Sequence, residues 1–280
     1  MTATLTTASL ATRLDERSKD LRRTIVETLR KGKRGHVGAA YSLVEILRVL
    51  YDDVLKFDAA NPRWAGRDRC ILSKGHGCLA LYAMLADKGF FPREELWKFC
   101  HFDGILGGHP DMEKVPGVEA STGALGHGLP IGVGFALHIR QQKSASRVFC
   151  ILGDGECNEG SVWEAAMCAG KHKLSHLTAI VDYNKHQAYG STAEVQDLEP
   201  FGDKWRAFGF AVREVDGHDV AALREAFAAL PFDAGKPSAI ICHTVKGKGA
   251  KCAENNMQWH HKSRVTDDDV ARLLAGIEEA

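Results

Sequence analysis

One aspartate of the sequence lies between two glycines and is followed, about thirty residues later, by an asparagine. These residues are Asp154, between Gly153 and Gly155, and Asn184. A hard divalent cation such as Mg²⁺ prefers oxygen ligands in an octahedral array, and a carboxylate, an amide oxygen and a nearby backbone carbonyl leave positions free for phosphate oxygens and water. Glycines beside the carboxylate let backbone and ligand approach closely. The pattern favours a site that binds a divalent cation and a phosphorylated molecule together.

Two plainer interpretations compete at the Gly-Asp-Gly tripeptide. A tight turn is the commonest use of such residues. A dinucleotide-binding loop is the second alternative, but the GxGxxG pattern requires a glycine where Asn158 stands. The Asp-Tyr-Asn segment at 182–184 makes both alternatives less favoured, because neither needs it.

The elements around these residues have to bring Asp154 and Asn184 together. From Arg147 onward, short apolar runs alternate with segments of helical period. This alternation predicts an α/β fold with a parallel sheet, right-handed crossovers and helices on both faces. The expected strands are 148–154, 177–184, 210–216 and 238–245, and the expected helices are 161–173, 203–208 and 220–230.

In such a sheet, ligands bind beyond the carboxyl ends of the strands. Asp154 closes one expected strand and Asn184 closes the next, so the two side chains can converge. The helix expected from residue 161 presents its free N–H groups and the positive end of its dipole to the same crevice. The place therefore suits a diphosphate.

The N-terminal part is expected to be mainly helical. Residues 12–31 have helical period, and Gly32 is a plausible stop. Ser42 is expected to cap a second helix over 43–55, followed by a loop and a short strand within 71–77. The polar segment 254–263 is expected to fold over a site or an interface.

Composition narrows the class of protein. The chain has 280 residues, 45% of them hydrophobic, and its 36 basic and 36 acidic residues balance. No overall field therefore favours nucleic acid or an anionic membrane, and an anion site must be built locally. Eight cysteines without CxxC spacing indicate reduced thiols. With no signal peptide and no run near the ~20 apolar residues of a membrane span, we expect a soluble, cytoplasmic protein.

Several further motifs occur in an order that resembles the transketolase family. The Gly-Asp-Gly and distant asparagine resemble that family's thiamine diphosphate motif. The resemblance covers nearly the whole chain, but only the N-terminal half of a full-length transketolase. The other matching segments are RGHVGAAYS at 34–42, RDRCILSKGHG at 67–77, GGHPD at 107–111, STGALGHG at 121–128, VKGKG at 245–249 and WHH at 259–261.

The resemblance implies that thiamine diphosphate binds here with Mg²⁺, or with another divalent cation such as Ca²⁺ or Mn²⁺. Asp154, Asn184 and the backbone carbonyl of His186 match the metal ligands. His76, Gly155 and the start of the following helix match the groups that hold the diphosphate. The complete implied cofactor-binding set is His76, Gly123, Leu125, Gly153, Asp154, Gly155, Glu159, Glu164, Asn184 and His186.

Four members of this set have roles away from the metal. The backbone of Gly123 matches the position that meets the aminopyrimidine, and Leu125 packs beside it. Glu159 and Glu164 match acids of a network that joins two active sites across a subunit interface. The plain alternative for these acids is a preference for negative charge at a helix start, worth ~0.3–1 kcal/mol.

Four histidines are implied to be catalytic: His36, His76, His109 and His260. By resemblance, His36, His109 and His260 line the substrate channel. Breaking a carbon–carbon bond next to a ketone needs an electron sink, which the cofactor's thiazolium ylide supplies, while protons leave one hydroxyl and reach another oxygen. Imidazoles suit this proton transfer because they titrate near neutrality.

The sequence departs from the family pattern at several positions. Ala124 replaces a proline, His127 stands where glutamine is frequent, and the segment beginning at His186 replaces aliphatic residues. None of these changes removes a ligand. His261 occupies a usual glycine position, so either His260 or His261 could face the substrate.

The family also needs a glutamate that protonates the aminopyrimidine, and it lies in a pyrimidine-binding domain C-terminal to the region matched here. We therefore expect residues 1–280 to form a single diphosphate-binding domain of a split transketolase, with the pyrimidine-binding domain on a separate chain. The expected assembly contains two copies of each chain (α2β2) with two-fold symmetry. The expected reaction is transfer of a two-carbon ketol unit from a ketose or ketose phosphate to an aldose or aldose phosphate.

Other functions remain open at this point. A deoxyxylulose phosphate synthase-like acyloin condensation uses the same cofactor, but that family is usually one longer chain. A non-catalytic scaffold subunit would not need the histidines and metal ligands that are intact here. A nicotinamide-binding oxidoreductase is the weakest alternative.

Overall fold

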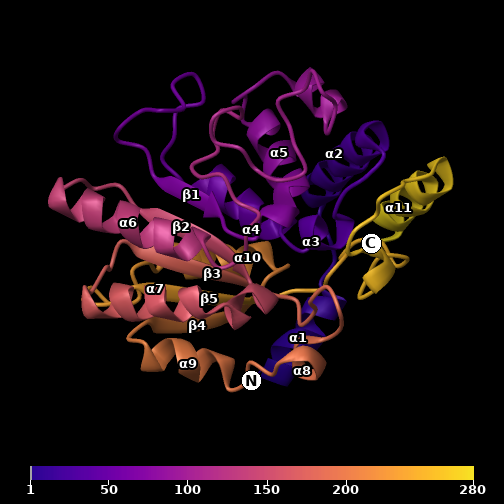
Figure 1. Ribbon diagram of the computed structural model, residues 1–280. Helices are drawn as coiled ribbons and strands as arrows, with labels where there is room; N and C mark the ends of the chain where they lie inside the picture. Colours follow the sequence, from indigo (N-terminus) through magenta and orange to yellow (C-terminus); the bar gives the residue numbers. More distant parts are fainter. Residues whose placement is uncertain (1) are drawn as a thin grey trace.

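A five-stranded parallel sheet forms the centre of the molecule (Figure 1). The computed structural model describes residues 2–280. The strand order is β1-β2-β3-β5-β4, and every neighbouring pair is parallel. The expected α/β fold with a parallel sheet between helices is confirmed. The strands are β1 Arg69–Leu72, β2 Val148–Gly153, β3 Leu177–Tyr183, β4 Ala211–Asp216 and β5 Ser238–His243.

The central strands are apolar because helices cover both of their faces. Every residue of β2, β3 and β5 is buried, as continuous hydrophobic runs in parallel sheets normally are. The register pairs Gly153 with Asp182 and Tyr183 with His243. The carboxyl ends of the three strands consequently meet at one edge of the sheet.

Two helical layers enclose the sheet (Figure 1). One core cluster joins α2, α4, α5, α10 and α11 to one face, and the other joins α6, α7 and α9 to the opposite face. Within residues 2–280, no helix has the length and apolarity needed to cross a membrane. The helices are α1 Thr2–Ala11, α2 Glu16–Gly32, α3 Val37–Tyr41, α4 Val44–Val49, α5 Cys78–Asp87, α6 Gly128–Gln141, α7 Gly160–Lys171, α8 Thr192–Val195, α9 Phe201–Ala207, α10 Val220–Ala228 and α11 Asp267–Glu279.

Short helical turns of other kinds complete the backbone. A π-helical turn at Leu50–Val54 extends α4. The 3-10 turns are Gly75–Gly77, Arg93–Lys98, Gly155–Asn158 and Met257–Trp259. Two of these turns carry residues of the predicted site.

The helix predicted over 12–31 is present as α2, but its predicted start is wrong. A separate helix, α1, ends at Ala11, and α2 begins only after Asp15, whose carboxylate accepts the N–H of Ser18 at 3.0 Å. The predicted stop at Gly32 is confirmed, and Lys33 follows it in the left-handed conformation with φ 57°. The break at residues 12–15 arises because the Asp15 cap satisfies the free N–H groups of a new helix.

Ser42 does not cap a helix, contrary to the prediction. Its hydroxyl donates to the carboxylate of Asp182 at 2.6 Å, and α4 begins at Val44. The buried carboxylate of Asp182 needs hydrogen-bond donors because it is a charged group away from water. The Ser42 hydroxyl is one of these donors and therefore does not cap a helix.

Candidate active site

The carboxyl ends of β2 and β3 bring the two predicted metal ligands together. Asp154 and Asn184 are both buried. The carboxylate of Asp154 accepts the backbone N–H of Gly155 at 2.8 Å and also that of Lys185, the residue after Asn184. The amide oxygen of Asn184 accepts the N–H of His186 at 3.1 Å. Asp154, Asn184 and the backbone of His186 therefore form one compact group.

The electrostatics of this group favour a cation. Burial, reinforced by the nearby Asp182 carboxylate, raises the pKa of Asp154 to about 6. Within residues 2–280 no basic side chain forms an ion pair with Asp154, and no cluster of three His, Cys, Asp or Glu side chains suits a metal. A mixed set of one carboxylate, one amide oxygen and a backbone carbonyl fits Mg²⁺ better than a soft metal.

Asp182 and Lys74 form a buried ion pair next to the predicted ligands. Asp182 accepts hydrogen bonds from the Lys74 ammonium and from the hydroxyls of Ser42 and Thr244. Burial on its own would raise the pKa of Asp182, but Lys74 and these donors together lower it. The sequence offered one signal for this pair, since a lysine and an aspartate each end an apolar run. Charged residues in such positions are expected to be buried, and buried charges are rare unless they are paired.

A second buried lysine lies on the same side of the site. The Lys246 ammonium is 2.8 Å from Nδ1 of His260 and 3.5 Å from the backbone oxygens of His186 and Gln187. Burial, and then the charge of Lys74, lower the pKa of Lys246 to about 8. An anion near these two ammonium groups would be strongly stabilised, so the residues present fit a diphosphate.

Glycines let the chain segments of this region approach one another closely. A Cβ added to Gly75 would lie 2.8 Å from the backbone nitrogen of Gly123, and one added to Gly155 would lie 2.6 Å from the Gln187 side chain. Gly123 has φ +147°, and a Cβ there would meet the His109 ring at 3.1 Å. Leu125 is half-buried on the same loop as Gly123. The loop thus approaches the His76 turn with backbone rather than side chains.

Glu156 organises this loop, although the sequence reasoning missed it. Its buried carboxylate accepts the N–H of Gly126 at 2.9 Å and that of Gly153 at 3.0 Å, together with the hydroxyl of Ser73. Burial raises its pKa. Glu156 thereby ties the ends of β1 and β2 to the loop that carries Gly123.

Glu159 and Glu164 lie elsewhere. Both are exposed, at the start of α7 and one turn further along it. Glu159 packs against Gly126, where an added Cβ would lie 2.6 Å from the Cβ of Glu159. The structure does not bring these two acids to Asp154, and their role across a subunit interface stays a prediction.

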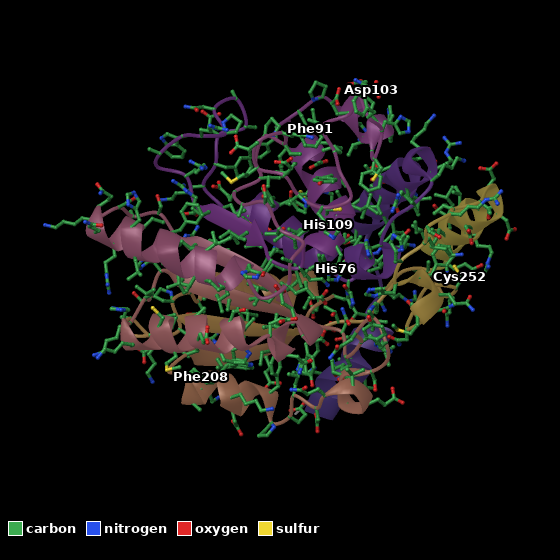
Figure 2. The ribbon with its side chains drawn as sticks, in the orientation of Figure 1. His76, Phe91, Asp103, His109, Phe208 and Cys252 are labelled. Atoms are coloured by element: carbon green, nitrogen blue, oxygen red, sulfur yellow. The ribbon has the colours of Figure 1, made fainter. Side chains whose placement is uncertain are left out.

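The predicted histidines gather around His36. Its ring centre is 5.6 Å from that of His76, 6.1 Å from His109, 5.7 Å from His260 and 4.6 Å from His261. Figure 2 shows His76 and His109 near the middle of the molecule, beside the end of the sheet. Four segments far apart in the sequence therefore supply one cluster of imidazoles.

His260 and His261 occupy different sides of this cluster. His260 lies 5.8 Å from His76 and contacts Lys246, on the side of the buried lysines. His261 lies against His36 and lines a cavity of about 710 Å³ that His36 and His109 also line. Each histidine contacts His36, so both residues of the pair belong to the site.

Four imidazoles of the cluster are neutral at physiological pH. Burial is the main cause, and it lowers the pKa of His36 to about 3 and that of His260 to about 4, with neighbouring positive groups adding to the effect. The pKa values of His76 and His109 are lowered for the same main reason. Neutral imidazoles can accept a proton from a bound molecule.

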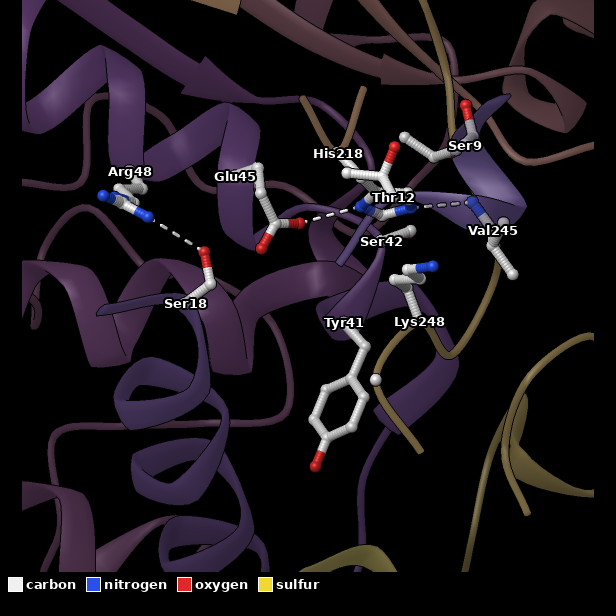
Figure 3. A network of polar contacts seen from close by, with 12 residues as sticks. Ser9, Thr12, Ser18, Tyr41, Ser42, Glu45, Arg48, His218, Val245 and Lys248 are labelled. Carbon is white, nitrogen blue, oxygen red and sulfur yellow. Dashed lines mark hydrogen bonds and ion pairs between the residues drawn. The ribbon is translucent and has the colours of Figure 1, made fainter. Parts of the chain in front are cut away.

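A separate charge network holds the loop that carries Lys246 (Figure 3). Nδ1 of His218 is 2.8 Å from the Glu45 carboxylate, and Nε2 of His218 accepts the N–H of Val245 at 2.9 Å. Arg22 binds Glu45 at 2.6 Å and donates to the backbone oxygen of Lys248 at 2.8 Å. This network connects α2 and α4 to the turn at 245–249.

Comparisons with known proteins agree with this geometry. A family model described as "Transketolase, thiamine diphosphate binding domain" matches residues 15–277. The chain is 41% identical over 266 residues to the 6-deoxy-6-sulfo-D-fructose transketolase subunit of a Clostridium species, covering 95% of this chain and 96% of that protein. It is 42% identical over 248 residues to one of the subunits of the apulose-4-phosphate transketolase of Phocaeicola vulgatus, covering 89% and 88% of the two chains.

Longer relatives match over part of their length only. The transketolase of Rattus norvegicus is 36% identical over 250 residues, which cover 89% of this chain and 40% of that protein. The solved transketolase of Leishmania mexicana has a TM-score of 0.88 at 30% identity, over 93% of this chain and 40% of that one. The chain thus spans 40% of the length of these proteins.

Proposed function

The chain belongs to the transketolase family, as its N-terminal part, and from this premise we propose that it is the diphosphate-binding subunit of a split transketolase. The complete enzyme would transfer a two-carbon ketol unit from a ketose to an aldose. The observation that carries this proposal is the group of five imidazoles around His36, placed between two buried lysines and an open cavity. Such a group suits proton transfers at a bound sugar.

Thiamine diphosphate, when bound, would supply the nucleophilic carbon and the electron sink that carbon–carbon bond cleavage requires. Asp154, Asn184 and the carbonyl of His186 would hold the divalent cation that accompanies it. Lys246 would stabilise the negative charge of the diphosphate, since its ammonium group is buried beside the predicted ligands and, within residues 2–280, has no carboxylate partner, whereas Lys74 is paired with Asp182. The backbone of Gly123 would leave room for the remainder of the cofactor.

The histidines would manage the protons. A ketose in the cavity would present its hydroxyl groups to His36, His109 and His261, which line it. An imidazole in its neutral form can accept a hydroxyl proton while the carbon–carbon bond breaks, and can return it to the oxygen of the acceptor. Lys246 beside His260 would orient that ring, and burial together with the positive charge of Lys246 would keep it neutral.

A second chain would complete the site. Two relatives of the same length are named as subunits, whereas the longer relatives named simply transketolase continue well beyond the matched region. We infer a pyrimidine-binding partner, assembled with this chain as α2β2, and place Glu159 and Glu164 at the interface between the two halves of the assembly. Sugar phosphates or sulfonated sugars are the proposed substrates, because the named substrates of the two subunit relatives are of these kinds.

A scaffold subunit without chemistry is the alternative to be tested. Two-carbon transfer from hydroxypyruvate to a panel of aldoses should be measured with this chain and its candidate partner, with and without thiamine diphosphate and Mg²⁺. Transfer that requires both additions supports the proposal. If the mixture transfers the unit equally well when Asp154 is replaced by alanine, the chain acts as a scaffold.

A further inference from the structure

The cavity beside the histidines carries positive charge that the reaction chemistry does not use. It is lined at one part by His36, His109 and His261, and elsewhere by Arg34 and Lys114. Its volume of about 710 Å³ lies within the range of small-molecule sites. A molecule that reaches the imidazoles from this cavity can therefore also reach the two basic side chains.

Arg34 has no acidic partner in the part of the chain that the structure describes. Its side chain is exposed and forms no hydrogen bond or ion pair there. Other basic residues nearby do have partners: Arg30 binds Glu27 at 2.6 Å, and Lys33 lies 3.5 Å from Asp267. A guanidinium that faces a cavity without a carboxylate partner is available to an oxyanion, whose planar pair of oxygens it matches well.

Lys114 adds a second unpaired charge to the lining of the same cavity. It too is exposed and forms no ion pair among residues 2–280. Asp111 is the one acidic residue that lines the cavity, and its carboxylate already accepts the N–H of Glu113 at 3.0 Å. The fixed charges of the lining consequently sum to a positive value, two basic groups against one acidic group.

Two backbone N–H groups of the cavity lining are further hydrogen-bond donors. Gly107 and Gly108 line the cavity, and within residues 2–280 their N–H groups have no acceptor, whereas the neighbouring N–H of Cys100 donates to Leu106 at 2.8 Å. Unpaired N–H groups beside basic side chains form the kind of concavity that binds anions.

We propose that Arg34 and Lys114 form an anion subsite on this chain that recognises the phosphate or sulfonate at the far end of the sugar substrate. The inference rests on the proposed function and deepens it, since it assigns part of substrate selection to this subunit rather than to its partner. Both anions are tetrahedral groups that present three oxygens, so the same donors can bind either one. The sugar would extend from the histidine cluster, where its carbonyl reacts, toward Arg34.

The test compares charged and uncharged acceptors in the assembled complex of this chain and its partner. Hydroxypyruvate is the donor, and the acceptors are glyceraldehyde, glyceraldehyde 3-phosphate and the analogue with a sulfonate in place of the phosphate. Arg34→Ala and Lys114→Ala should each lower kcat/KM for a charged acceptor by about 10- to 100-fold, the loss of a charge-assisted hydrogen bond. The same variants should change kcat/KM for glyceraldehyde by less than about twofold, because that acceptor makes no such bond.

Lys33→Gln is the matched control, because it removes a positive charge next to Arg34 from a side chain that does not line the cavity. It should leave the preference for charged acceptors unchanged. The two charged acceptors distinguish phosphate from sulfonate. A loss of kcat/KM with both acceptors means that the subsite binds either anion, and a loss with only one means that it binds that anion. An equal loss with charged and uncharged acceptors, or no loss, overturns the inference.

A failure of the proposed function would look different. Wild-type complex that is inactive with all three acceptors contradicts the ketol transfer. The subsite is then decided by NMR titration of the chain with glycerol 3-phosphate: shifts of the Arg34 guanidinium signal that are absent with glycerol support it, and equal responses to both compounds overturn it.

Discussion

Asp154 is the residue on which the proposed metal site depends most. Its carboxylate is buried beside that of Asp182, and its hydrogen bonds come from backbone N–H groups. Burial raises the pKa of this carboxyl to about 6, so at neutral pH it is mainly ionised but less stable than an exposed carboxylate would be. The apo chain therefore bears an electrostatic cost that a bound cation would remove.

Replacement of Asp154 tests this assignment. Asp154→Asn keeps an oxygen that can accept the Gly155 N–H but removes the charge. We expect it to lower the Mg²⁺-dependent affinity for thiamine diphosphate by at least about 100-fold, since even indirect disruption of a metal site costs 10- to 100-fold. Calorimetric titration of thiamine diphosphate into the complex of this chain and its partner, in the presence of Mg²⁺, measures the affinity. Circular dichroism checks that the variant is folded. Unchanged affinity would remove Asp154 from the site.

His109 should behave differently, because it lines the cavity and lies away from the buried lysines. His109→Ala should leave cofactor affinity within about threefold and lower kcat by about 100-fold or more, the usual contribution of a positioned acid or base. Steady-state kinetics beside a cofactor titration distinguishes the two effects. The exposed His172, outside the site, provides a control in His172→Ala. Normal turnover in His109→Ala would make His109 a structural residue.

The buried imidazoles also predict how stability depends on pH. His36 has a pKa of about 3 in the folded chain and an ordinary value of about 6.5 when unfolded. The unfolded state thus binds more protons below pH 6.5, and stability falls as the pH decreases through this value. His36 alone should remove up to about 1.4 kcal/mol per pH unit.

Urea unfolding at pH 8 and at pH 5.5 measures this loss. His36→Asn should reduce the difference between the two free energies of unfolding, whereas His172→Asn should not. Equal stability of the wild type at both pH values would contradict the predicted burial of a neutral His36.

At the scale of elements, the alternating part of the chain was predictable because its strands are completely buried. The expected strands 148–154, 177–184, 210–216 and 238–245 agree with β2 to β5 within two residues at each end. Continuous apolar runs bounded by Gly, Asp or Asn indicate such strands directly. The helix expected after the Gly-Asp-Gly tripeptide, which is α7, was predictable from the same alternation of strands and helices.

Several helices could not be predicted in this way. α5 is almost entirely buried, so it shows no contrast between an apolar and a polar face. α6 begins with Gly-Leu-Pro-Ile-Gly, a composition that normally indicates a loop. For α6, tertiary packing against β1 and β2 outweighs this local preference.

The residues of the candidate site also divide into those that the sequence could identify and those that it could not. The motif residues, from His36 to His260, could be identified from sequence because they occur in a family order. Lys74, Asp182 and Glu156 could not be assigned roles, because their importance comes from burial and from partners far away in the chain. Burial of a charged group is a property of the fold, and it becomes visible only with the structure.

The network of Arg22, Glu45 and His218 allows a prediction about element packing. Glu45→Ala leaves the fully buried Arg22 without its carboxylate, so the free energy of unfolding should fall by about 3–5 kcal/mol. Glu16 also binds Arg23, at 2.5 Å, but is exposed, and Glu16→Ala should cost less than about 1 kcal/mol. Urea denaturation compares the two variants. Equal losses would contradict the role given to the buried network.

At the scale of the whole molecule, the chain matches only part of its longer relatives. The sheet, the histidine cluster and the lysine pair belong to one chain of 280 residues, whereas full-length relatives continue far beyond the matched region. α6 and α7 pack together, and each exposes one large apolar side chain, Ile131 and Met167. We predict that catalysis needs a second polypeptide.

The most direct test is to measure two-carbon transfer from hydroxypyruvate to an aldose with this chain alone, with the partner alone, and with mixtures at increasing ratios. Thiamine diphosphate and Mg²⁺ are kept saturating throughout. We predict no transfer by either chain alone and activity that rises with the ratio until the two chains are equimolar. Full transfer by this chain alone would contradict this prediction.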